Sequence, residues 1–399
     1  MTKRRLLFFQ HVAWIGGSTW SLFQIIHAIK DNYDITVILS VDGPLRQALE
    51  EIGVAVFVDT RLVPFCGAFA GWYSLLFHSG NRRGILSYRS CVRAAEEVCA
   101  EIKPDIVYVN VSVLFPVAKG AKRAGVDHVI LHVREPLFFP VGGFQERIKD
   151  RVVKECVSQV IAITEGNAEE FKDAPNCLIV HNWPDFKGRD APFDVYESYG
   201  IERGRKIILV MGGRHQCKGT LVALKAAASM QRDDFCILAI GLHKPASRMK
   251  ELIRWTLDAL NIKTYGRQLD YYARTGTPKI VATESTLSVK SILEEASIVL
   301  CPFTSPHFAK ASIEAGYLSK PVVISDCGGF TESIENEDTG IIVPPGDIQG
   351  LAVQLERLLD DEALCEQLGQ KLHDKVMSDF SSAKSIRQIC SILTFMSND

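Results

Sequence analysis

Short, uninterrupted apolar runs alternate with amphipathic helical patterns along this chain. The first runs are "RRLLFFQHV", "DITVILS" and "VAVFVD". Between the first two lies "STWSLFQIIHAIKD", whose apolar residues at 22, 23, 25, 26 and 29 predict a helix with a Ser/Thr cap. A strand that is apolar on both faces is buried on both faces, which favours a parallel sheet covered by helices. The pattern therefore predicts an α/β fold built from doubly wound, Rossmann-like sheets.

The length of 399 residues suits two domains. The runs "DIVYVN", "HVILHV", "VIAIT" and "CLIVHN" complete a first Rossmann-like domain, predicted over residues 1–187. A polar, Pro- and Gly-rich stretch over 188–204 reads as a linker. The pattern restarts at "KIILVMGG" and predicts a second Rossmann-like domain over 205–378, with helices at 219–230 and 247–260. Residues 261–280 fit no clean element and read as an insertion, and 379–399 predict a C-terminal helix that could cross back to the first domain.

Composition excludes several classes of protein. The net charge of −2 gives no field that would attract nucleic acid. The eleven cysteines show no CxxC and no Cys/His ligand spacing. Together with the lack of a secretory leader at the start, this predicts reduced thiols in a cytoplasmic protein without a metal site. No apolar run approaches the roughly 20 residues of a membrane-spanning helix.

One window has a distinct charge. Residues 61–95 contain five arginines and no acid, interleaved with aromatic residues such as Phe65, Phe69 and Trp72. Basic and aromatic residues in a segment too short and too polar to cross a bilayer are typical of a surface that lies on an anionic membrane. For a cytoplasmic protein this surface would contact the inner face of the membrane. The alternative is a long loop whose aromatic side chains pack under the first domain.

In each domain, a glycine-containing loop follows the first strand. Two tandem Rossmann-like domains predict a cleft at the carboxyl ends of both sheets, where ligands of such sheets bind. Gly16 and Gly17 precede a helix start, which suits an anion, although a tight turn is the alternative. The third glycine of a GxGxxG fingerprint is absent, so nicotinamide binding is poorly supported.

The second loop, "MGGRHQCKGT", brings two cations to a helix start. Gly213 is followed by Arg214 and Lys218, an arrangement that can neutralise a phosphate or pyrophosphate, although both could be ordinary surface charges. Further along, Glu314 follows the predicted strand "SIVLCPF". Its carboxylate could accept hydrogen bonds from the vicinal hydroxyls of a ribose, or it could serve only the helix dipole.

These motifs together resemble those of GT-B glycosyltransferases of family 4, the large group of retaining nucleotide-sugar transferases, and the similarity covers nearly the whole chain. The second half is the more specific, because "IEAGYLSKPVVISDCGGFTE" resembles the family signature. The residues that match family motifs are Gly16, Gly17, Asn182, Gly213, Arg214, Lys218, Gly219, Glu314, Ala315, Pro321, Gly328, Gly329 and Glu332.

The resemblance implies two Rossmann-like domains facing across a cleft, and transfer of a hexose-type unit from a nucleoside diphosphate sugar to a hydroxyl acceptor. It implies same-face attack with retained configuration, in synthesis of a polysaccharide, glycolipid or glycoconjugate. If residues 61–95 contact a membrane, we expect the acceptor to be lipid-linked. Arg214 and Lys218 would stabilise the leaving diphosphate without a metal or cofactor. His132, in "LHVRE", matches the family histidine near the transferred sugar, although a buried core histidine is the alternative. Arg134 and Glu135 follow it.

The sequence departs from the family at one position. The family signature has two glutamates separated by seven residues, and the position of the first is Pro306 here. The nucleotide half of the site, including Glu314, should survive, whereas the sugar contacts would fall to His307, Phe308, Ala309 and Lys310. The loss also supports an alternative function, a degenerate nucleotide-sugar-binding or scaffold subunit that needs a catalytic partner.

Overall fold

The computed structural model divides the chain into two compact units. Unit 1 comprises Met1–Asn182 together with Ser382–Asp399, and unit 2 comprises Trp183–Ser381. The structure describes residues 3–14, 16–66, 79–137, 139, 143–186, 192–242, 264–275, 279–284, 286, 288–328 and 331–396.

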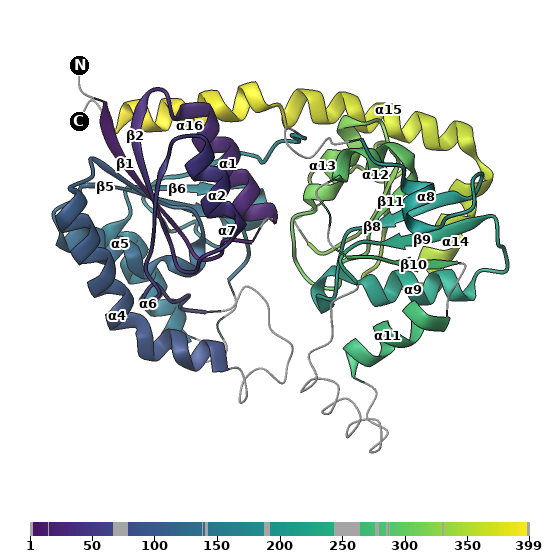
Figure 1. Cartoon of the computed structure of the whole chain (residues 1–399), viewed down its shortest axis with the longest axis horizontal. Helices are drawn as coiled ribbons and strands as arrows, with labels where there is room; N and C mark the ends of the chain where they lie inside the picture. Colours follow the sequence, from purple (N-terminus) through teal and green to yellow (C-terminus); the bar gives the residue numbers. More distant parts are fainter. Residues whose placement is uncertain are drawn as a thin grey trace. The chain divides into compact units, whose positions relative to one another are not determined.

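The described strands of unit 1 form one parallel sheet in the order β3-β2-β1-β4-β5-β6-β7. The strands are β1 (Arg4–Gln10), β2 (Tyr33–Leu39), β3 (Ala55–Val58), β4 (Ile106–Val109), β5 (His128–Val133), β6 (Gln159–Ala162) and β7 (Cys177–Ile179). The helices are α1 (Gly17–Ile29), α2 (Pro44–Glu51), α4 (Ser79–Ile102), α5 (Pro116–Arg123), α6 (Gly143–Cys156), α7 (Glu165–Glu169) and α16 (Ser382–Phe395), with a 3₁₀ turn at Ser112–Leu114. Figure 1 shows α4, α5 and α6 on one face of this sheet and α1 and α16 on the other.

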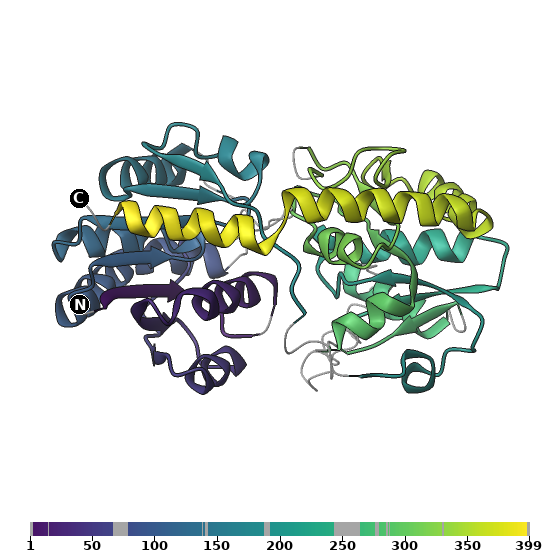
Figure 2. The same cartoon turned by 90° about the horizontal axis from the view of Figure 1, so that it is seen from above.

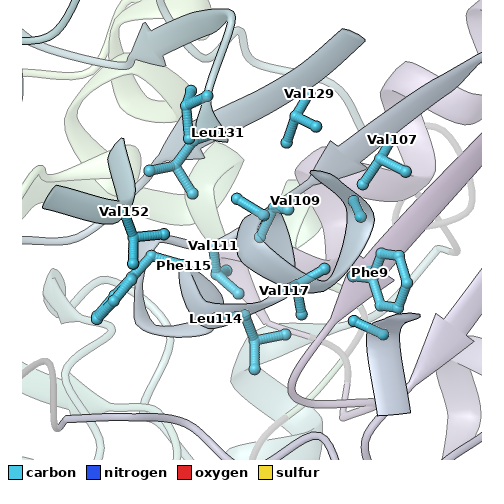
Figure 3. Close-up of a cluster of buried hydrophobic side chains, with 14 of the residues drawn as sticks. Phe9, Val107, Val109, Val111, Leu114, Phe115, Val117, Val129, Leu131 and Val152 are labelled. Carbon is cyan, nitrogen blue, oxygen red and sulfur yellow. The ribbon is translucent and has the colours of Figure 1, made fainter. Parts of the chain in front are cut away.

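The two faces of the sheet carry different side chains because successive residues of a strand point to opposite sides. On one face Phe9, Val107, Val109, Val129 and Leu131 pack with residues of α4 and α5 into a buried core (Figure 3). The opposite face carries Phe8 and Tyr108, whose ring centroids lie 4.7 Å apart. Polar residues follow on this second face where the strands end.

Helix α16 completes unit 1 although it follows unit 2 in the sequence. It packs against α1 (Figure 2). Ser385 Oγ donates to the carbonyl oxygen of His181 at 2.9 Å, and the Arg4 guanidinium donates to that of Met396 at 3.5 Å. Residues far apart in the sequence therefore share this edge of unit 1.

The described strands of unit 2 form a second parallel sheet in the order β10-β9-β8-β11-β12-β13. The strands are β8 (Lys206–Val210), β9 (Phe235–Ala239), β10 (Ile280–Ala282), β11 (Ala296–Cys301), β12 (Val322–Ser325) and β13 (Ile341–Val343). The helices are α8 (Val195–Tyr199), α9 (Thr220–Ser229), α11 (Tyr265–Thr275), α12 (Val289–Glu295), α13 (Lys310–Tyr317), α14 (Ile348–Asp360) and α15 (Glu362–Asp379), with a 3₁₀ turn at Gln216–Lys218. Helices α9, α11 and α14 pack on one face (Figure 1).

The predicted fold class, two doubly wound Rossmann-like sheets, is confirmed. The prediction that residues 261–280 form no clean element is wrong, because α11 and the start of β10 lie there. Tyr265, Leu269 and Tyr272 pack into the core of unit 2 at helical spacing, and only Leu269 is fully buried, which makes the pattern weak in the sequence. The predicted helix at 247–260 lies outside the described residues. Within the predicted linker the structure places α8.

Two expectations about composition can be compared with the fold. None of the described helices combines the length and the hydropathy that crossing a bilayer requires. All eleven cysteines are free thiols, and most are buried.

Candidate functional site

Three polar residues lie side by side at the carboxyl edge of the unit 1 sheet. Phe9 pairs with Val109 and Val109 pairs with Leu131, so the next residues, Gln10, Asn110 and His132, occupy equivalent positions in three neighbouring strands. All three are buried. The Asn110 side-chain amide donates to Gln10 Oε1 at 2.8 Å, which links two of them directly. The sheet order β1-β4-β5 therefore assembles a polar cluster from residues about 100 positions apart.

Arg134 contacts two members of this cluster, Asn110 and His132, and also Asn182. Its Nε donates to Asn110 Oδ1 at 2.9 Å, and one terminal nitrogen donates to Asn182 Oδ1 at 2.8 Å. The other terminal nitrogen lies 3.2 Å from His132 Nδ1. Burial lowers the pKa of Arg134 to about 10, so the guanidinium still carries its charge at neutral pH.

His132 is fully enclosed and uncharged. Burial, and then the nearby Arg134 charge, hold the pKa of the imidazole well below its usual value. The Tyr108 hydroxyl lies 2.6 Å from His132 Nδ1. Nε2, the other ring nitrogen, is buried and has no hydrogen-bond partner within the described structure. His132 is thus a buried histidine, as the alternative interpretation expects. It also has a ring nitrogen, Nε2, for which the described residues offer no hydrogen-bond partner.

The predicted anion loop lies beside the same cluster. Asn110 Nδ2 also approaches the carbonyl oxygen of Ser18, at 3.3 Å, at the start of α1. The backbone N–H of Gly16 is already bound by Thr19 Oγ1 at 2.8 Å. A Cβ on Gly17 would meet no atom within 4 Å, so open space lies beside this glycine. The Gly16 N–H is thus already engaged, whereas the space beside Gly17 leaves room for a ligand.

In unit 2, the loop after β8 presents Lys218. Gly213 and Gly219 have positive φ angles of 55° and 66°, which favour glycine, and the backbone N–H of Gly213 donates to Ile240 at 3.2 Å. Lys218 Nζ lies 5.9 Å from the centroid of the Phe303 ring. Burial lowers the pKa of Lys218, while the nearby Glu314 carboxylate acts in the opposite direction.

Arg214 is held by the protein itself. One terminal nitrogen donates to Asp270 Oδ1 at 2.6 Å and to the carbonyl oxygen of Leu242 at 3.1 Å, and the other donates to that of Gly266 at 3.1 Å. These contacts use both hydrogens of the first terminal nitrogen and one of the second. Among the described residues, Nε of the guanidinium makes no further hydrogen bond. Its predicted role at a phosphate stays a prediction.

Glu314 lies in α13 with only 3% of its surface exposed. Lys310 Nζ, one helical turn earlier, is 3.9 Å from a carboxylate oxygen of Glu314. The cations of Lys310 and Lys218 thus both act on this carboxylate. A carboxylate can accept two hydrogen bonds, as recognition of a vicinal diol requires.

The segment before α13 combines packed and polar residues. The His307 ring meets that of Phe303 edge to face, with centroids 5.1 Å apart. Burial and the nearby Lys218 charge hold the pKa of His307 well below its usual value. The side chains of Phe308 and Ala309 are buried, so their backbones are the parts that a ligand could meet. Pro306, where the family has its first glutamate, is exposed.

The predicted site residues thus fall into two groups. In unit 1 the structure brings His132 together with the start of α1, which includes Gly17. In unit 2 it brings Lys218, His307, Lys310 and Glu314 together, with Arg214 turned toward α11. None of these roles is tested by the geometry alone, and they stay predictions.

Sequence reasoning missed the residues that surround His132. Tyr108, Gln10 and Asn110 were not singled out, and Asn182 was noted only as a motif match. A polar residue directly after a bare apolar strand, as in "LLFFQ" and "DIVYVN", was the available signal. In the part of the chain that the structure describes, no group of three or more His, Cys, Asp or Glu side chains could hold a metal ion.

At the start of the window at 61–95, the described residues include one paired arginine and one buried aromatic residue. Arg61 pairs with Asp59 at 2.7 Å and with Glu97 at 2.6 Å, just outside the acid-free window. Phe65 is buried and packs edge to face on Tyr88 and Phe115, which fits the packing alternative. Residues 67–78 lie outside the described residues, as do the side chains of 79–83.

Comparison with known families places the more specific similarity in unit 2. Residues 279–374 match the family "Glycosyl transferases group 1". The capsular polysaccharide biosynthesis glycosyltransferase CapM of Staphylococcus aureus is 31% identical over 113 residues, which cover 28% of this chain and 30% of CapM. The alpha-D-kanosaminyltransferase of Streptomyces kanamyceticus is 25% identical over 279 residues, 69% of this chain and 63% of the relative. The chain thus aligns with less than two thirds of the length of each of these relatives.

Solved structures match over nearly the whole chain. HepE from Anabaena in complex with UDP and glucose has a TM-score of 0.75 at 18% identity, covering 98% of this chain and 99% of HepE. Sucrose-phosphate synthase from Thermosynechococcus elongatus has a TM-score of 0.74 at 14% identity, covering 99% and 100%. At these identities the likeness concerns the fold, and the fold is GT-B.

Proposed function

From a chain that has the GT-B fold, resembles family 4 and carries a glycosyl transferases group 1 match over residues 279–374, we propose that this protein is a glycosyltransferase using a nucleoside diphosphate sugar. The observation that carries the proposal is the buried Glu314 carboxylate with Lys310 Nζ 3.9 Å from it. The loop that bears Lys218 is joined to the segment before α13, because the backbone N–H of Thr304 donates to the carbonyl oxygen of Cys217 at 2.9 Å. A cation near a carboxylate that can accept from a diol suits a group that has both phosphate and ribose, as a nucleotide does.

The donor site would work by charge and hydrogen bonding. Departure of the diphosphate builds negative charge on the leaving oxygen, and Lys218 would stabilise that charge, together with Nε of Arg214. Glu314 would hold the ribose. His132, as a neutral donor in unit 1, would bind a sugar hydroxyl. These roles need no protein carboxylate as nucleophile, which fits same-face attack and retention at the anomeric carbon, with the leaving phosphate accepting the proton of the acceptor hydroxyl.

A direct binding screen tests this function. Saturation-transfer NMR of the purified protein against UDP-, GDP- and ADP-sugars should reveal one donor that binds, and UDP-glucose is the first to try because HepE has been solved with UDP-glucose. Lys218→Ala should lose the signal, whereas Lys290→Ala, on the half-exposed Lys290–Glu294 pair, should keep it. Binding of none of these sugars by the wild-type protein would reject the proposal.

Retention and metal independence can be tested with the same donor once an acceptor is found. The anomeric coupling constant of the product should match that of the donor. Lys218 and Arg214 are proposed to supply the positive charge at the diphosphate, so turnover should survive excess EDTA. An inverted product, or turnover restored only by a divalent cation, would refute these parts of the proposal.

Replacement of the first motif glutamate by Pro306 supports one alternative, a nucleotide-sugar-binding subunit that needs a catalytic partner. Both functions predict binding, but only the enzyme predicts turnover. Release of UDP from a bound UDP-sugar in the presence of membrane extracts, lost in Lys218→Ala, would favour the enzyme. Binding without turnover by the protein alone, with turnover on addition of a partner, would favour the subunit.

A lipid-linked acceptor, with contact to an anionic membrane, is the part of the proposal that concerns partners. Support comes from α4, where Leu86 is 84% exposed and Arg89 and Arg93 are exposed at helical spacing from it. Arg89→Ser with Arg93→Ser should reduce binding to vesicles that contain anionic lipid. Arg61→Ser is the control, because Arg61 is already paired. Equal vesicle binding by all three proteins would remove the membrane from the proposal.

A further inference from the structure

Arg134 fixes the direction of the hydrogen bonds around it because a guanidinium can only donate. The atoms it binds must therefore be acceptors: Asn110 Oδ1 at 2.9 Å, Asn182 Oδ1 at 2.8 Å and His132 Nδ1 at 3.2 Å. The identity of each of these atoms, which is otherwise ambiguous for an amide or an imidazole, follows from a single residue.

The orientation of the Asn110 amide in turn determines the orientation of the Gln10 amide. Since Asn110 turns its oxygen to Arg134, its nitrogen faces Gln10 and donates to Oε1 at 2.8 Å. Gln10 must then direct its own nitrogen elsewhere. That nitrogen is buried and has no hydrogen-bond partner within the described structure.

The same reasoning fixes the tautomer of His132. Nδ1 accepts from Arg134, and the Tyr108 hydroxyl also lies 2.6 Å from it. The imidazole is neutral, because burial and Arg134 hold its pKa well below the usual value. Its single ring proton therefore sits on Nε2, the buried atom for which the described residues offer no partner.

Two buried donors, one on β1 and one on β5 with β4 between them, thus have no acceptor among the described residues. A buried donor without a partner costs about 1–3 kcal/mol, so such groups are rare unless a ligand completes them. Two N–H donors at one sheet edge, beside the open space at Gly17, suit a ligand rich in hydroxyl oxygens.

We propose that Arg134 is a positioning residue that orients this network so that His132 Nε2 and Gln10 Nε2 donate hydrogen bonds to hydroxyl oxygens of a bound sugar. The inference rests on the proposed function for its ligand. It adds Gln10 as a binding residue and gives Arg134 a role that is separate from contact with the substrate.

The orientation can be tested without any ligand. Nitrogen NMR of protein labelled with ¹⁵N-histidine distinguishes the two neutral tautomers, and His132→Gln identifies the signal. The expected state at neutral pH is neutral His132 with its proton on Nε2. If His132 of the wild-type protein carries its proton on Nδ1, or is an imidazolium, the proposal is wrong.

Two variants separate Arg134 from Tyr108. Tyr108→Phe should keep the Nε2–H tautomer, since Arg134 still donates to Nδ1. Arg134→Gln should allow a mixture of tautomers. If the Tyr108 variant changes the tautomer, the hydroxyl sets it and the role assigned to Arg134 is wrong, whether or not the Arg134 variant folds.

The ligand arm uses UDP and UDP-glucose as probes. Gln10→Glu keeps the oxygen that accepts from Asn110 but replaces the donating nitrogen by an acceptor. Calorimetry should show UDP-glucose affinity reduced at least tenfold, with UDP affinity unchanged. An equal effect on both ligands, or none, would overturn the role of Gln10. If the wild-type protein binds neither UDP nor UDP-glucose, the proposed donor is wrong and the tautomer result still decides the role of Arg134.

Discussion

Arg214 and Asp270 form a 2.6 Å ion pair that joins the loop after β8 to helix α11. Both side chains are about one fifth exposed, so the pair is only partly screened by solvent. If Arg214 binds a phosphate of the donor, as proposed, the Asp270 carboxylate competes with that phosphate for its charge.

Asp270→Asn tests this competition. The amide oxygen can still accept the Arg214 hydrogen bond, but the negative charge is gone. We expect donor affinity to rise about two- to fivefold, the size of a partly exposed ion-pair interaction. Titration of UDP-glucose by calorimetry measures the effect. A fall in affinity would mean that Asp270 holds Arg214 in place for the ligand, and unchanged affinity would place Arg214 outside the phosphate site.

Lys218→Ala should slow turnover about 10²–10³-fold, as removal of a group that stabilises developing charge does elsewhere. The fall should appear in kcat as well as kcat/KM, because the charge on the diphosphate grows as the bond to the sugar breaks. Steady-state kinetics with circular dichroism as a check of folding provide the measurement. A change of less than threefold in a folded variant would rule out the role.

Glu314→Gln tests recognition of the ribose. If the carboxylate accepts hydrogen bonds from the diol, the variant should lose about 1.5–3 kcal/mol of UDP affinity, as charged hydrogen bonds contribute. For a nucleotide that lacks the diol, the variant and the wild-type protein should then have the same affinity. We therefore expect 2′,3′-dideoxyuridine diphosphate to bind both equally, and an equal loss for both nucleotides would assign Glu314 a purely structural role.

Two glycines that match family motifs should respond differently to alanine. A Cβ at Gly219 would lie 1.5 Å from the carbonyl oxygen of Pro302, and its φ of 66° disfavours alanine, so Gly219→Ala should unfold or strongly destabilise unit 2. Gly17→Ala meets no atom and should keep the melting temperature within about 2 °C, a surface-type effect. If a ligand approaches Gly17, this variant should still weaken UDP-glucose binding. Thermal unfolding and calorimetry check both results.

The raised pKa of the Glu135 carboxyl leads us to expect that the stability of the protein depends on pH. Burial raises the pKa of this carboxyl to about 7, although Ser112 donates to it and Arg134 lies nearby. The folded protein therefore keeps a proton that the unfolded chain releases above about pH 4.5, so stability falls as pH rises from about 4.5 to 7.

Glu135→Gln removes this loss because the amide cannot ionise. We expect the variant to match the wild-type protein near pH 4.5 and to be up to about 3 kcal/mol more stable at pH 8. Urea unfolding at the two pH values measures the difference. Glu169→Gln, an exposed carboxylate paired with Lys172, is the control and should change little. Equal pH profiles for the Glu135 variant and the wild-type protein would contradict the prediction.

The fold was largely predictable because its strands are bare apolar runs, and burial on both faces leaves few alternatives for such segments. Helix α11 was missed because only Leu269 is fully buried in it. The cation and carboxylate of unit 2 were also visible, since Lys218 and Glu314 follow strand ends at recognisable motifs.

The cluster around Arg134 was not predictable in the same way. Its members belong to strands that are neighbours only because the sheet order is β1-β4-β5, so Gln10 meets Asn110 across 100 residues. The Arg214–Asp270 pair spans 56 residues and depends on a helix that the sequence pattern did not indicate. Local patterns identify strands and loops, whereas these contacts depend on how strands and helices are ordered in space.

Helix α16 has a consequence for synthesis of the protein. Because Ser382–Asp399 belongs to unit 1 and all of unit 2 precedes it in the chain, the ribosome finishes unit 2 before it delivers the last helix of unit 1. The emerging Met1–Asn182 segment therefore waits with the surface under α16 uncovered while about 200 further residues are made, at roughly 5–20 residues per second. During that interval a chaperone could bind the uncovered surface, and unit 2 would be the first to reach its native state.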